Sequence, residues 1–275
     1  MAGYLYDISG RTISESHNII GESLPVAYDY LGNEIVIDTP RFLETAILTA
    51  FPSFTENGPK QGLCTDGTYI YIAGSTSMSY TYGKMIKYDI SQGTYEVKQY
   101  ESSVPFNHGN DLAYDPNNGR IYVATMTTDG GVVVVNSANL NYVKTIYLKN
   151  DAGNAYPVRQ IAFNRDNKHF YASSDENTVY EYTQNFEYIG KVTHPTLPEA
   201  THQSFETDGR FLYRVIYNPN FVIVSTLTGE SVASINIDFS GEPESVAYNW
   251  ENGEFYMNTP QNSDFLYRIQ LYETS

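Results

Sequence analysis

Cysteine is almost absent from the sequence. Cys64 is the single cysteine among 275 residues, so no disulfide can form within the chain. Such a chain fits a reducing cytoplasm, and it fits a bacterial or viral surface protein equally well. Cys64 lies inside an apolar strand pattern, so we expect a small buried side chain there rather than a nucleophile.

Basic residues are also scarce. The 16 lysines and arginines stand against 32 aspartates and glutamates, which gives a formal net charge of −16. A field of this sign repels the phosphates of nucleic acids and of anionic membranes. The charge therefore predicts that no nucleic acid is a partner.

Long apolar runs are missing as well. No stretch approaches the ~20 apolar residues that a membrane-spanning helix needs, so we expect no membrane span. The first seven residues, MAGYLYD, have neither the basic start nor the apolar core of a Sec signal peptide. If the protein works on a virion tail or a cell surface, we expect it to leave the cell by another route, such as a particle released by lysis.

Helical periodicity is absent after residue 42, and strand-forming residues take its place. There are 26 tyrosines, and tyrosine, valine, isoleucine and threonine favour pleated, half-buried strands. Five short segments recur at intervals of 41 to 49 residues, and each ends in Asp or Asn. They cover residues 62–66, 111–115, 160–164, 204–208 and 245–249. A period of this length is typical of folds that repeat one structural unit.

Each segment continues in the same way. A turn rich in Gly, Asp and Asn follows it, then a second and a third strand, and four of the five repeats add a fourth strand. The pattern predicts an all-β fold, a five-bladed β-propeller with four antiparallel strands in each blade. A β-sandwich is the weaker alternative, because it would not show so regular a repeat.

The last repeat ends after its third strand. We expect residues 42–50, a further strand-like run, to supply the missing outer strand and close the ring; the alternative is a plain strand on the side of the propeller. The propeller then spans residues 42–275, and residues 1–41 form an N-terminal β-hairpin extension. Hairpins are predicted at residues 6–13 and 28–35, either for attachment or as a simple surface extension.

Polar residues mark every entry into an innermost strand. In a propeller these entries gather around the central axis, which makes them the predicted ligand site. The candidate ligand-binding residues there are Gln61, His108, Asn110, Asp111, Gln160, His202, Gln203 and Glu244. Tyr80, Tyr82 and Tyr217 lie in flanking loops and are candidates for stacking on sugar rings. The alternative is that the polar groups satisfy one another and a column of water.

A catalytic role for the same face would need two carboxylates ~5–9 Å apart, as in glycoside hydrolysis. The candidates are Asp111, Glu206 and Glu244. Glu206 is unusual, because the other four repeats carry Cys or Ala at its position and a buried carboxylate costs free energy unless it is paired. We expect its partner to be Arg159, Arg214, His202 or a metal ion.

The histidines do not predict a metal centre. His108 and His202 occupy similar places in two repeats, where an acidic neighbour could join them as a ligand. Their wide separation in the sequence makes this signal weak, so no metal site is predicted, and the sequence identifies no cofactor.

The strand entries resemble those of a known family. The segments QGLCTD (61–66), HGNDLAYDPN (108–117) and HQSF (202–205) are similar to the entries of helveticin-type propellers. Similar propellers form platform domains in receptor-binding proteins of phages of Gram-positive bacteria, and MAGYLYD resembles the start of phage tail proteins. The resemblance covers residues 61–275 and implies a five-bladed propeller that recognises cell-wall or other surface glycans. The chain departs from that pattern because it has no coiled-coil stem and no tower domain after the propeller.

These observations predict non-enzymatic binding of a carbohydrate or cell-wall glycan on the central face. The protein would act as a phage-tail or surface adhesin, with other tail or surface subunits as further partners. Two alternatives stay open, because a fold alone does not choose among functions. One is a glycoside hydrolase or lyase that uses the central carboxylates, although an arabinanase-like enzyme places one of them in the first blade, where this chain has Gln61 and Gly62. The other is a protein-interaction scaffold.

Overall fold

The computed structural model describes most of the chain. The described residues are 40–51, 57–76, 82–174, 177–194, 201–260 and 265–273, together with four short strands before residue 40. By its internal contacts the chain divides into two compact units, Met1–Arg41 and Phe42–Ser275. The described residues contain no helix, and therefore none that could cross a membrane.

The first unit contains two antiparallel pairs of strands. In one pair β1 (Leu5–Tyr6) lies beside β2 (Thr12–Ile13), and in the other β3 (Ala27–Tyr28) lies beside β4 (Glu34–Ile35). These are the two segments in which the sequence predicts hairpins.

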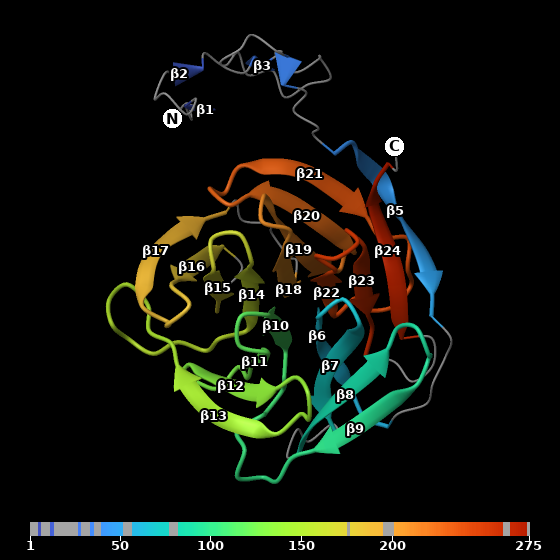
Figure 1. Cartoon of the computed structure of the whole chain (residues 1–275), viewed down its shortest axis with the longest axis vertical. Helices are drawn as coiled ribbons and strands as arrows, with labels where there is room; N and C mark the ends of the chain where they lie inside the picture. Colours follow the sequence, from blue (N-terminus) through green and yellow to red (C-terminus); the bar gives the residue numbers. More distant parts are fainter. Residues whose placement is uncertain are drawn as a thin grey trace. The chain divides into compact units, whose positions relative to one another are not determined.

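Three sheets of the second unit have four strands each, and consecutive strands pair antiparallel (Figure 1). The first sheet consists of β6 (Lys60–Thr65), β7 (Tyr69–Ser75), β8 (Gly83–Asp89) and β9 (Tyr95–Gln99). The second consists of β10 (Asp111–Asp115), β11 (Arg120–Ala124), β12 (Gly131–Asn136) and β13 (Tyr142–Tyr147). The third consists of β14 (Gln160–Asn164), β15 (His169–Ser173), β16 (Thr178–Tyr182) and β17 (Tyr188–Thr193).

The last two repeats share one sheet of eight strands. Four come from the fourth repeat: β18 (Thr201–Thr207), β19 (Phe211–Tyr217), β20 (Phe221–Thr226) and β21 (Ser231–Asn236). Three come from the fifth: β22 (Ser245–Tyr248), β23 (Phe255–Asn258) and β24 (Leu266–Tyr272). The eighth is β5 (Phe42–Ala50), which lies between β21 and β24.

The strand β5 pairs antiparallel with β24, the outer position that the sequence predicts for it. It also meets β21 in a parallel bridge between Thr45 and Asn236. The sequence predicts a separate sheet for each of the last two repeats. The hydrogen bonds do not separate them, because β5 bonds to a strand on each side.

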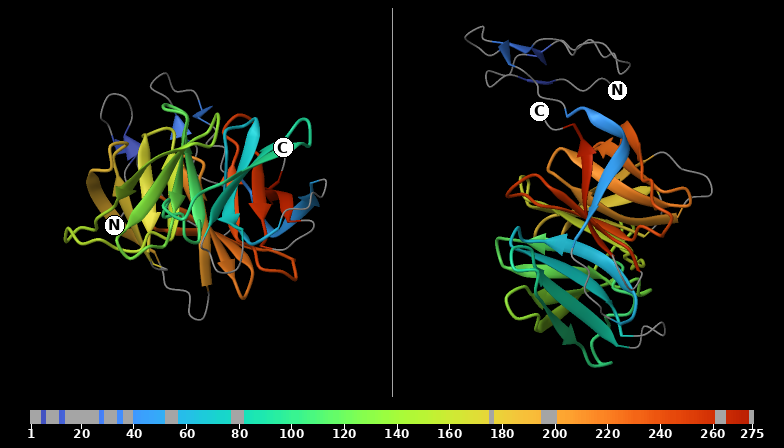
Figure 2. Two further views of the ribbon diagram at one scale, coloured as in Figure 1. Left: turned by 90° about the horizontal axis from the view of Figure 1, so that it is seen from below. Right: turned by 90° about the vertical axis from the view of Figure 1, so that its right-hand side faces the viewer.

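The first strand of every repeat lies near a common centre, and the later strands lie outside it (Figure 1). These inner strands, β6, β10, β14, β18 and β22, contact one another in a closed cycle in which β22 returns to β6. Figure 2 shows the same sheets from the side. The inner strands all begin at one end of the central axis, here named the entry end, and they finish at the other, the exit end.

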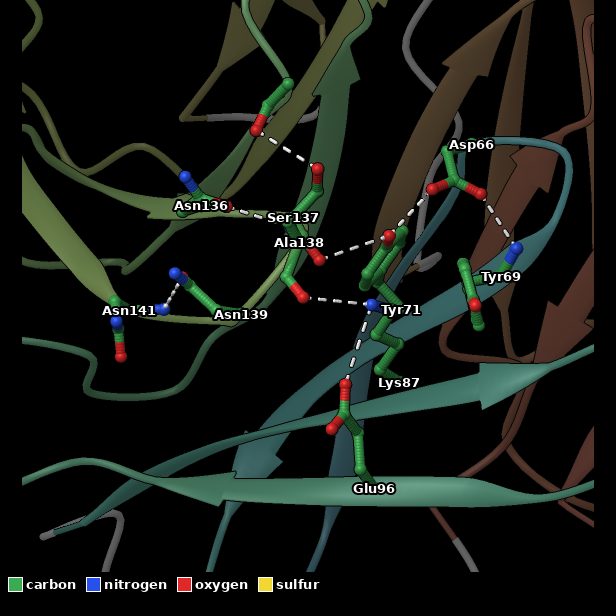
Figure 3. A network of polar contacts seen from close by, with 11 residues as sticks. Asp66, Tyr69, Tyr71, Lys87, Glu96, Asn136, Ser137, Ala138, Asn139 and Asn141 are labelled. Atoms are coloured by element: carbon green, nitrogen blue, oxygen red, sulfur yellow. Dashed lines mark hydrogen bonds and ion pairs between the residues drawn. The ribbon is translucent and has the colours of Figure 1, made fainter.

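A turn motif explains why aspartate and tyrosine recur together. The Asp66 carboxylate accepts hydrogen bonds from backbone N–H groups of its own turn and from the Tyr71 hydroxyl at 2.7 Å (Figure 3). Asp208 holds Tyr213 in the same way at 2.7 Å. In the other repeats asparagine side chains donate to the corresponding hydroxyls: Asn118 to Tyr122, Asn167 to Tyr171 and Asn249 to Tyr256. Each tyrosine can therefore be buried with its polar end satisfied.

The core lies between neighbouring sheets. One buried cluster joins the first and second repeats through Cys64 and Leu112. Another joins the first repeat to the last through Leu63 and Tyr256, so the cycle is closed by packing as well as by strand contacts. Burial of such a side chain contributes about 1.5–3 kcal/mol each, which makes these seams a main source of stability.

Candidate functional site

Asp111 lies at the centre of the axis. It is fully buried at the start of β10, and its carboxylate accepts four hydrogen bonds. Its Oδ1 accepts from the backbone N–H of Leu112 and from the hydroxyl of Ser245, both at 3.0 Å. Its Oδ2 accepts from the backbone N–H of Ile161 at 3.0 Å and of Phe205 at 3.3 Å. One carboxylate thus links four of the inner strands.

Asp111 and two serines together form a ring of hydrogen bonds around the axis, here named the axial ring. Ser245 Oγ accepts from the backbone N–H of Leu63 at 3.1 Å, and Ser204 Oγ accepts from that of Val246 at 3.2 Å. With the groups bound by Asp111, the equivalent N–H is therefore satisfied in all five inner strands. A buried N–H without an acceptor costs free energy, which explains why short polar side chains gather here.

The absence of a side chain at Gly62 lets the backbone of Asp111 approach β6 closely. A Cβ on Gly62 would lie 2.8 Å from Cα of Asp111, closer than a side-chain carbon can approach a backbone atom. The two inner strands also bond directly, because the N–H of Gly62 donates to the carbonyl of Gly109 at 3.0 Å. A glycine on β6 and an aspartate on β10 therefore fit each other at the axis.

The geometry favours a structural role for Asp111 over catalysis. Burial raises the pKa of its carboxyl well above the usual range, while the hydrogen bonds from Ile161, Phe205 and Ser245 lower it. An ionised carboxylate offers about four lone-pair sites, and Asp111 already accepts four hydrogen bonds. A general acid or base needs a free oxygen that can reach the substrate.

Between the axial ring and the entry end, two inner strands each contain a β-bulge with a glutamine in it. The pairing of β6 with β7 shifts between Lys60 and Leu63, which places Gln61 in a bulge. The pairing of β18 with β19 shifts between His202 and Ser204, which does the same for Gln203. A bulge bends its strand and re-aims the extra side chain, so both amides leave the regular ladder.

Each of these glutamines binds a carboxylate of the loop before β22. Gln61 Nε2 donates to Glu244 Oε1 at 3.1 Å, and Gln203 Nε2 donates to Glu242 Oε1 at 2.6 Å. Glu244 is only 4% exposed. Its burial, with Glu242 nearby as a second negative charge, raises the pKa of Glu244 to about 8, and the hydrogen bond from Gln61 opposes the shift.

Asn110 connects two further entries. Its Nδ2 donates to the backbone carbonyls of Arg159 at 2.8 Å and Gln203 at 3.0 Å. Its Oδ1 lies 3.1 Å from Nδ1 of His108, and burial lowers the pKa of that imidazole. The structure thus brings together Gln61, His108, Asn110, Gln203 and Glu244, as the sequence predicts for the entry end.

Two buried amides in this region keep free polar atoms. Gln160, at the position equivalent to Asp111, Ser204 and Ser245, is 4% exposed, and within the described structure its side chain makes no hydrogen bond. Asn258, at the end of β23, donates from Nδ2 to the carbonyl of Gln61 at 2.7 Å. Its Oδ1 is buried and has no donor among the described residues.

Glu206 lies deeper, two residues beyond Ser204 along β18. Its Oε1 accepts from the backbone N–H of Thr207 at 2.8 Å, and its Oε2 accepts from that of Tyr248 at 3.4 Å. Burial raises the pKa of Glu206 to about 8, while these hydrogen bonds and the charge of Arg165 lower it. The described structure therefore gives Glu206 backbone N–H partners rather than the side chains of Arg159, Arg214 or His202.

Arg165 covers the exit end, and the sequence analysis missed it. Its Nη1 lies 2.9 Å from Oε1 of Glu251, and its guanidinium lies over the rings of Tyr114 at 5.8 Å and Trp250 at 5.6 Å. Residues of three repeats therefore meet beneath the axis. A sequence signal existed, since Arg165 and Trp250 follow the closing Asn of their segments where two other repeats have Gly.

Three of the remaining predicted residues belong to the described structure, and one does not. His202 is buried at the start of β18, opposite Ile216. Tyr217 is half-buried at the end of β19, which pairs with that same start of β18. Tyr82 is 47% exposed in the segment before β8, and Tyr80 lies outside the described residues.

The last two features of the described residues concern metal-binding groups and the cysteine. Within them no group of three or more His, Cys, Asp or Glu side chains is placed to hold a metal ion. Cys64 is buried, and burial raises the pKa of its thiol well above the usual value, as expected for a packing residue.

Comparison with known proteins identifies the fold and no family. No protein-family model and no curated relative matches the sequence. Glutaminyl cyclase from Myxococcus xanthus matches with a TM-score of 0.62 at 13% identity, over 84% of this chain and 99% of that chain. Streptogramin B lyase matches with a TM-score of 0.49 at 15% identity, over 84% of this chain and 88% of that chain. At such identity the first likeness is one of fold alone, and the chain has an all-β, propeller-like fold.

Proposed function

We propose that residues 42–275 form a five-bladed β-propeller that binds a carbohydrate or cell-surface glycan at its entry end without transforming it. The five inner strands that contact one another in a closed cycle support this blade number. On this interpretation β5 belongs to the fifth blade, because it pairs along much of β24 and meets β21 only at Thr45.

The observation that carries the proposal is the hydrogen-bonded set at the entry end. Amide, carboxylate and imidazole groups from four different strand entries converge there on one place: Gln61, His108, Asn110, Gln203, Glu242 and Glu244. Planar amide and carboxylate groups on a rigid scaffold suit recognition of sugar hydroxyls, which both donate and accept hydrogen bonds. The half-buried Tyr217 adds an aromatic ring near the same end.

The proposed biological setting is adhesion. The resemblance of the strand entries to helveticin-type propellers supports a cell-wall glycan as the ligand, on a virion tail or a cell surface. The net charge of −16 fits a neutral or cationic glycan better than a phosphate-rich polymer.

A glycoside hydrolase is the second candidate, and Glu244 is the observation that favours it. Its pKa of about 8 keeps this carboxyl largely protonated at neutral pH, as a general acid requires, and Glu242 lies in the same loop as a possible base. Against it, Asp111 is saturated by hydrogen bonds, and Glu206 lies deeper along the inner strand.

A glycan array followed by titration calorimetry on the best ligand tests the proposal. Gln61→Ala and Gln203→Ala should each weaken binding by roughly 2- to 10-fold, the effect of losing one neutral hydrogen bond. Each change also removes the amide that holds Glu244 or Glu242 in place. Gln92→Ala is the matched control, because Gln92 is exposed in the turn between β8 and β9.

The outcomes separate the candidates. Binding that falls in both site variants and stays unchanged in the control supports a glycan site at the entry end. Reducing ends released from the bound glycan, and lost in Glu244→Gln, would favour the hydrolase instead. No binding to any glycan, together with capture of a protein partner that sugars do not displace, would overturn the proposal.

A further inference from the structure

We infer that the glycan bound at the entry end carries a free amino group, so that the ligand is a cationic amino sugar rather than a neutral or N-acetylated one. This inference rests on the proposed glycan binding. It follows from a count of donors and acceptors among the residues that face the site.

The two carboxylates supply more acceptors than the protein satisfies. Glu242 and Glu244 each receive one hydrogen bond from a neutral amide, Gln203 and Gln61 respectively. Among the described residues, no Lys, Arg or His nitrogen pairs with either carboxylate. An ionised carboxylate as buried as that of Glu244, which is 4% exposed, is costly without a cation beside it.

Asn258 adds a third unmet acceptor next to Glu244. Its Nδ2 is held by the carbonyl of Gln61, the residue whose side chain binds Glu244, and its backbone carbonyl accepts from the N–H of Glu244 at 2.9 Å. Its Oδ1 is buried and has no donor within the described structure. A buried acceptor left unpaired costs free energy, so a bound donor would be favoured here.

Gln160 is an independent sign of a ligand. Its side chain is buried at the axis and makes no hydrogen bond within the described structure, although its equivalents Asp111, Ser204 and Ser245 all do. Its amide atoms are not among the fully buried unpartnered atoms, so they reach solvent, where a hydroxyl or an amine of a ligand can replace water. The entry end therefore presents the Gln160 amide and the Asn258 Oδ1 atom without protein partners in the described structure.

An ammonium group matches this excess of acceptors better than the alternatives. It brings three N–H donors and a positive charge, whereas an N-acetyl group brings one N–H and a further carbonyl acceptor. Hydrogen bonds between an ammonium and a carboxylate are about twice as strong as neutral ones. A divalent metal is the weaker fit, since no cluster of three ligating side chains occurs in the described residues.

The titration of Glu244 supports the same conclusion. Glu242 from its own loop and Gln61 from β6 act on its carboxyl, and burial together with Glu242 raises its pKa to about 8. At neutral pH the free site therefore holds a proton on this carboxyl for most of the time. A bound ammonium would take over the role of that proton and leave the carboxylate ionised.

The experiment compares two oligosaccharides of equal length by titration calorimetry at pH 7 and 150 mM salt: a β-1,4-linked glucosamine oligomer and its N-acetylated form. The glucosamine oligomer should bind about tenfold or more tightly, the value of a charge-assisted hydrogen bond. Glu244→Gln should abolish most of this preference, measured as the ratio of the affinities of the variant for the two oligomers. Glu242→Gln provides a second variant if the first one fails to fold.

Glu187→Gln is the matched control, because it removes the same charge from an exposed position on the outer part of the third repeat. An equal loss in this control would mean that the overall field of the acidic protein attracts the amine, and it would overturn the inference. Equal binding of both oligomers would overturn the inference but keep the proposed glycan binding. No binding of either oligomer, with binding to no other glycan, would remove the proposed function itself.

Discussion

The carboxylate of Asp111 accepts a hydrogen bond of 3.0 Å from the backbone N–H of Ile161, 50 residues away along the chain. The same Oδ2 atom also accepts from the N–H of Phe205, 94 residues away. With the hydroxyl of Ser245 on Oδ1, one side chain therefore holds strands of four repeats together where they meet at the axis. Because the repeats are not joined covalently across this centre, such contacts set the spacing of the inner strands.

Replacing Asp111 with alanine should destabilise the fold strongly. The change removes every hydrogen bond at the carboxylate and leaves the N–H groups of Leu112, Ile161 and Phe205 buried without an acceptor. Each such group costs about 1–3 kcal/mol, so we expect the free energy of unfolding to fall by about 3 kcal/mol or more. Urea unfolding followed by the fluorescence of Trp250 measures this change. A loss below about 1 kcal/mol would contradict the structural role assigned to Asp111.

Two buried serines, one inside the axial ring and one outside it, form a variant and its matched control. Ser245 donates to Asp111 and accepts from the N–H of Leu63, whereas Ser225 Oγ is buried with no partner in the described structure. Ser245→Ala should therefore cost about 1–3 kcal/mol of unfolding free energy, while Ser225→Ala should be neutral or slightly stabilising. Thermal unfolding of both variants tests this, and equal effects would mean that the axial hydrogen bonds contribute little.

Gly62 should tolerate no side chain. A Cβ there would lie 2.8 Å from backbone atoms of Asp111, which cannot move without separating β6 from β10. We expect Gly62→Ala to cost about 1–3 kcal/mol, the usual penalty for overpacking. Gly190→Ala is the control, since a Cβ at Gly190 meets nothing within 4 Å, and alanine there should stabilise by about 0.5–1 kcal/mol. Calorimetry measures the melting temperatures of the two variants. A shift in the same direction for Gly62→Ala and Gly190→Ala would refute the close approach of Gly62 to Asp111.

Much of the fold could be predicted because its signals are local. A Tyr on the second strand recurs in every repeat, and an Asp or Asn at the end of the inner strand or in the turn after it bonds to the hydroxyl of that Tyr. The missing fourth strand of the last repeat likewise predicts the place of β5 beside β24. The bridge from Thr45 to Asn236 could not be foreseen, because it depends on how closely β21 approaches and not on any pattern in the sequence.

The candidate site was predictable only in part. The repeat shows which residues enter the inner strands, and Gln61, Asn110 and Gln203 do come together there. Apart from the bond between Asp111 and the Ser245 hydroxyl, the hydrogen bonds of Asp111 and Glu206 come from backbone N–H groups, which every residue except proline possesses, so no residue type marks them. The bulges that turn the two glutamines are likewise set by strand pairing, which the sequence does not record residue by residue.

The attachment of β5 can be tested with neighbouring residues. Ala46 is the one fully buried residue of β5 and packs in a cluster with Ile235 and Ile269, whereas Ile47 is 54% exposed. Ala46→Asp places an unpaired carboxylate among apolar side chains and should cost about 2 kcal/mol or more. Ile47→Asp should cost less than about 1 kcal/mol, since it changes only an exposed strand position. Urea unfolding compares the two, and equal losses would mean that β5 is not packed against the last repeats.

Glu206 should make stability depend on pH. Its pKa is about 8 in the folded protein against an ordinary value of 4.5, so the folded state holds the proton more tightly than the unfolded state does. The resulting contribution to stability is fully present below pH 4.5 and is lost as the pH rises through about 8. We therefore expect Glu206→Gln, which keeps the shape and cannot ionise, to behave like the native protein near pH 4.5.

The same variant should be the more stable protein near pH 8.5, by a margin on the order of 3 kcal/mol. Unfolding free energies measured in urea across this range give the difference between the two proteins, in which the similar titration of Glu244 cancels. Profiles that run parallel would contradict the prediction. They would mean that Glu206 is ionised in the fold, in which case the N–H groups of Thr207 and Tyr248, with Arg165 beyond them, suffice to hold a buried negative charge.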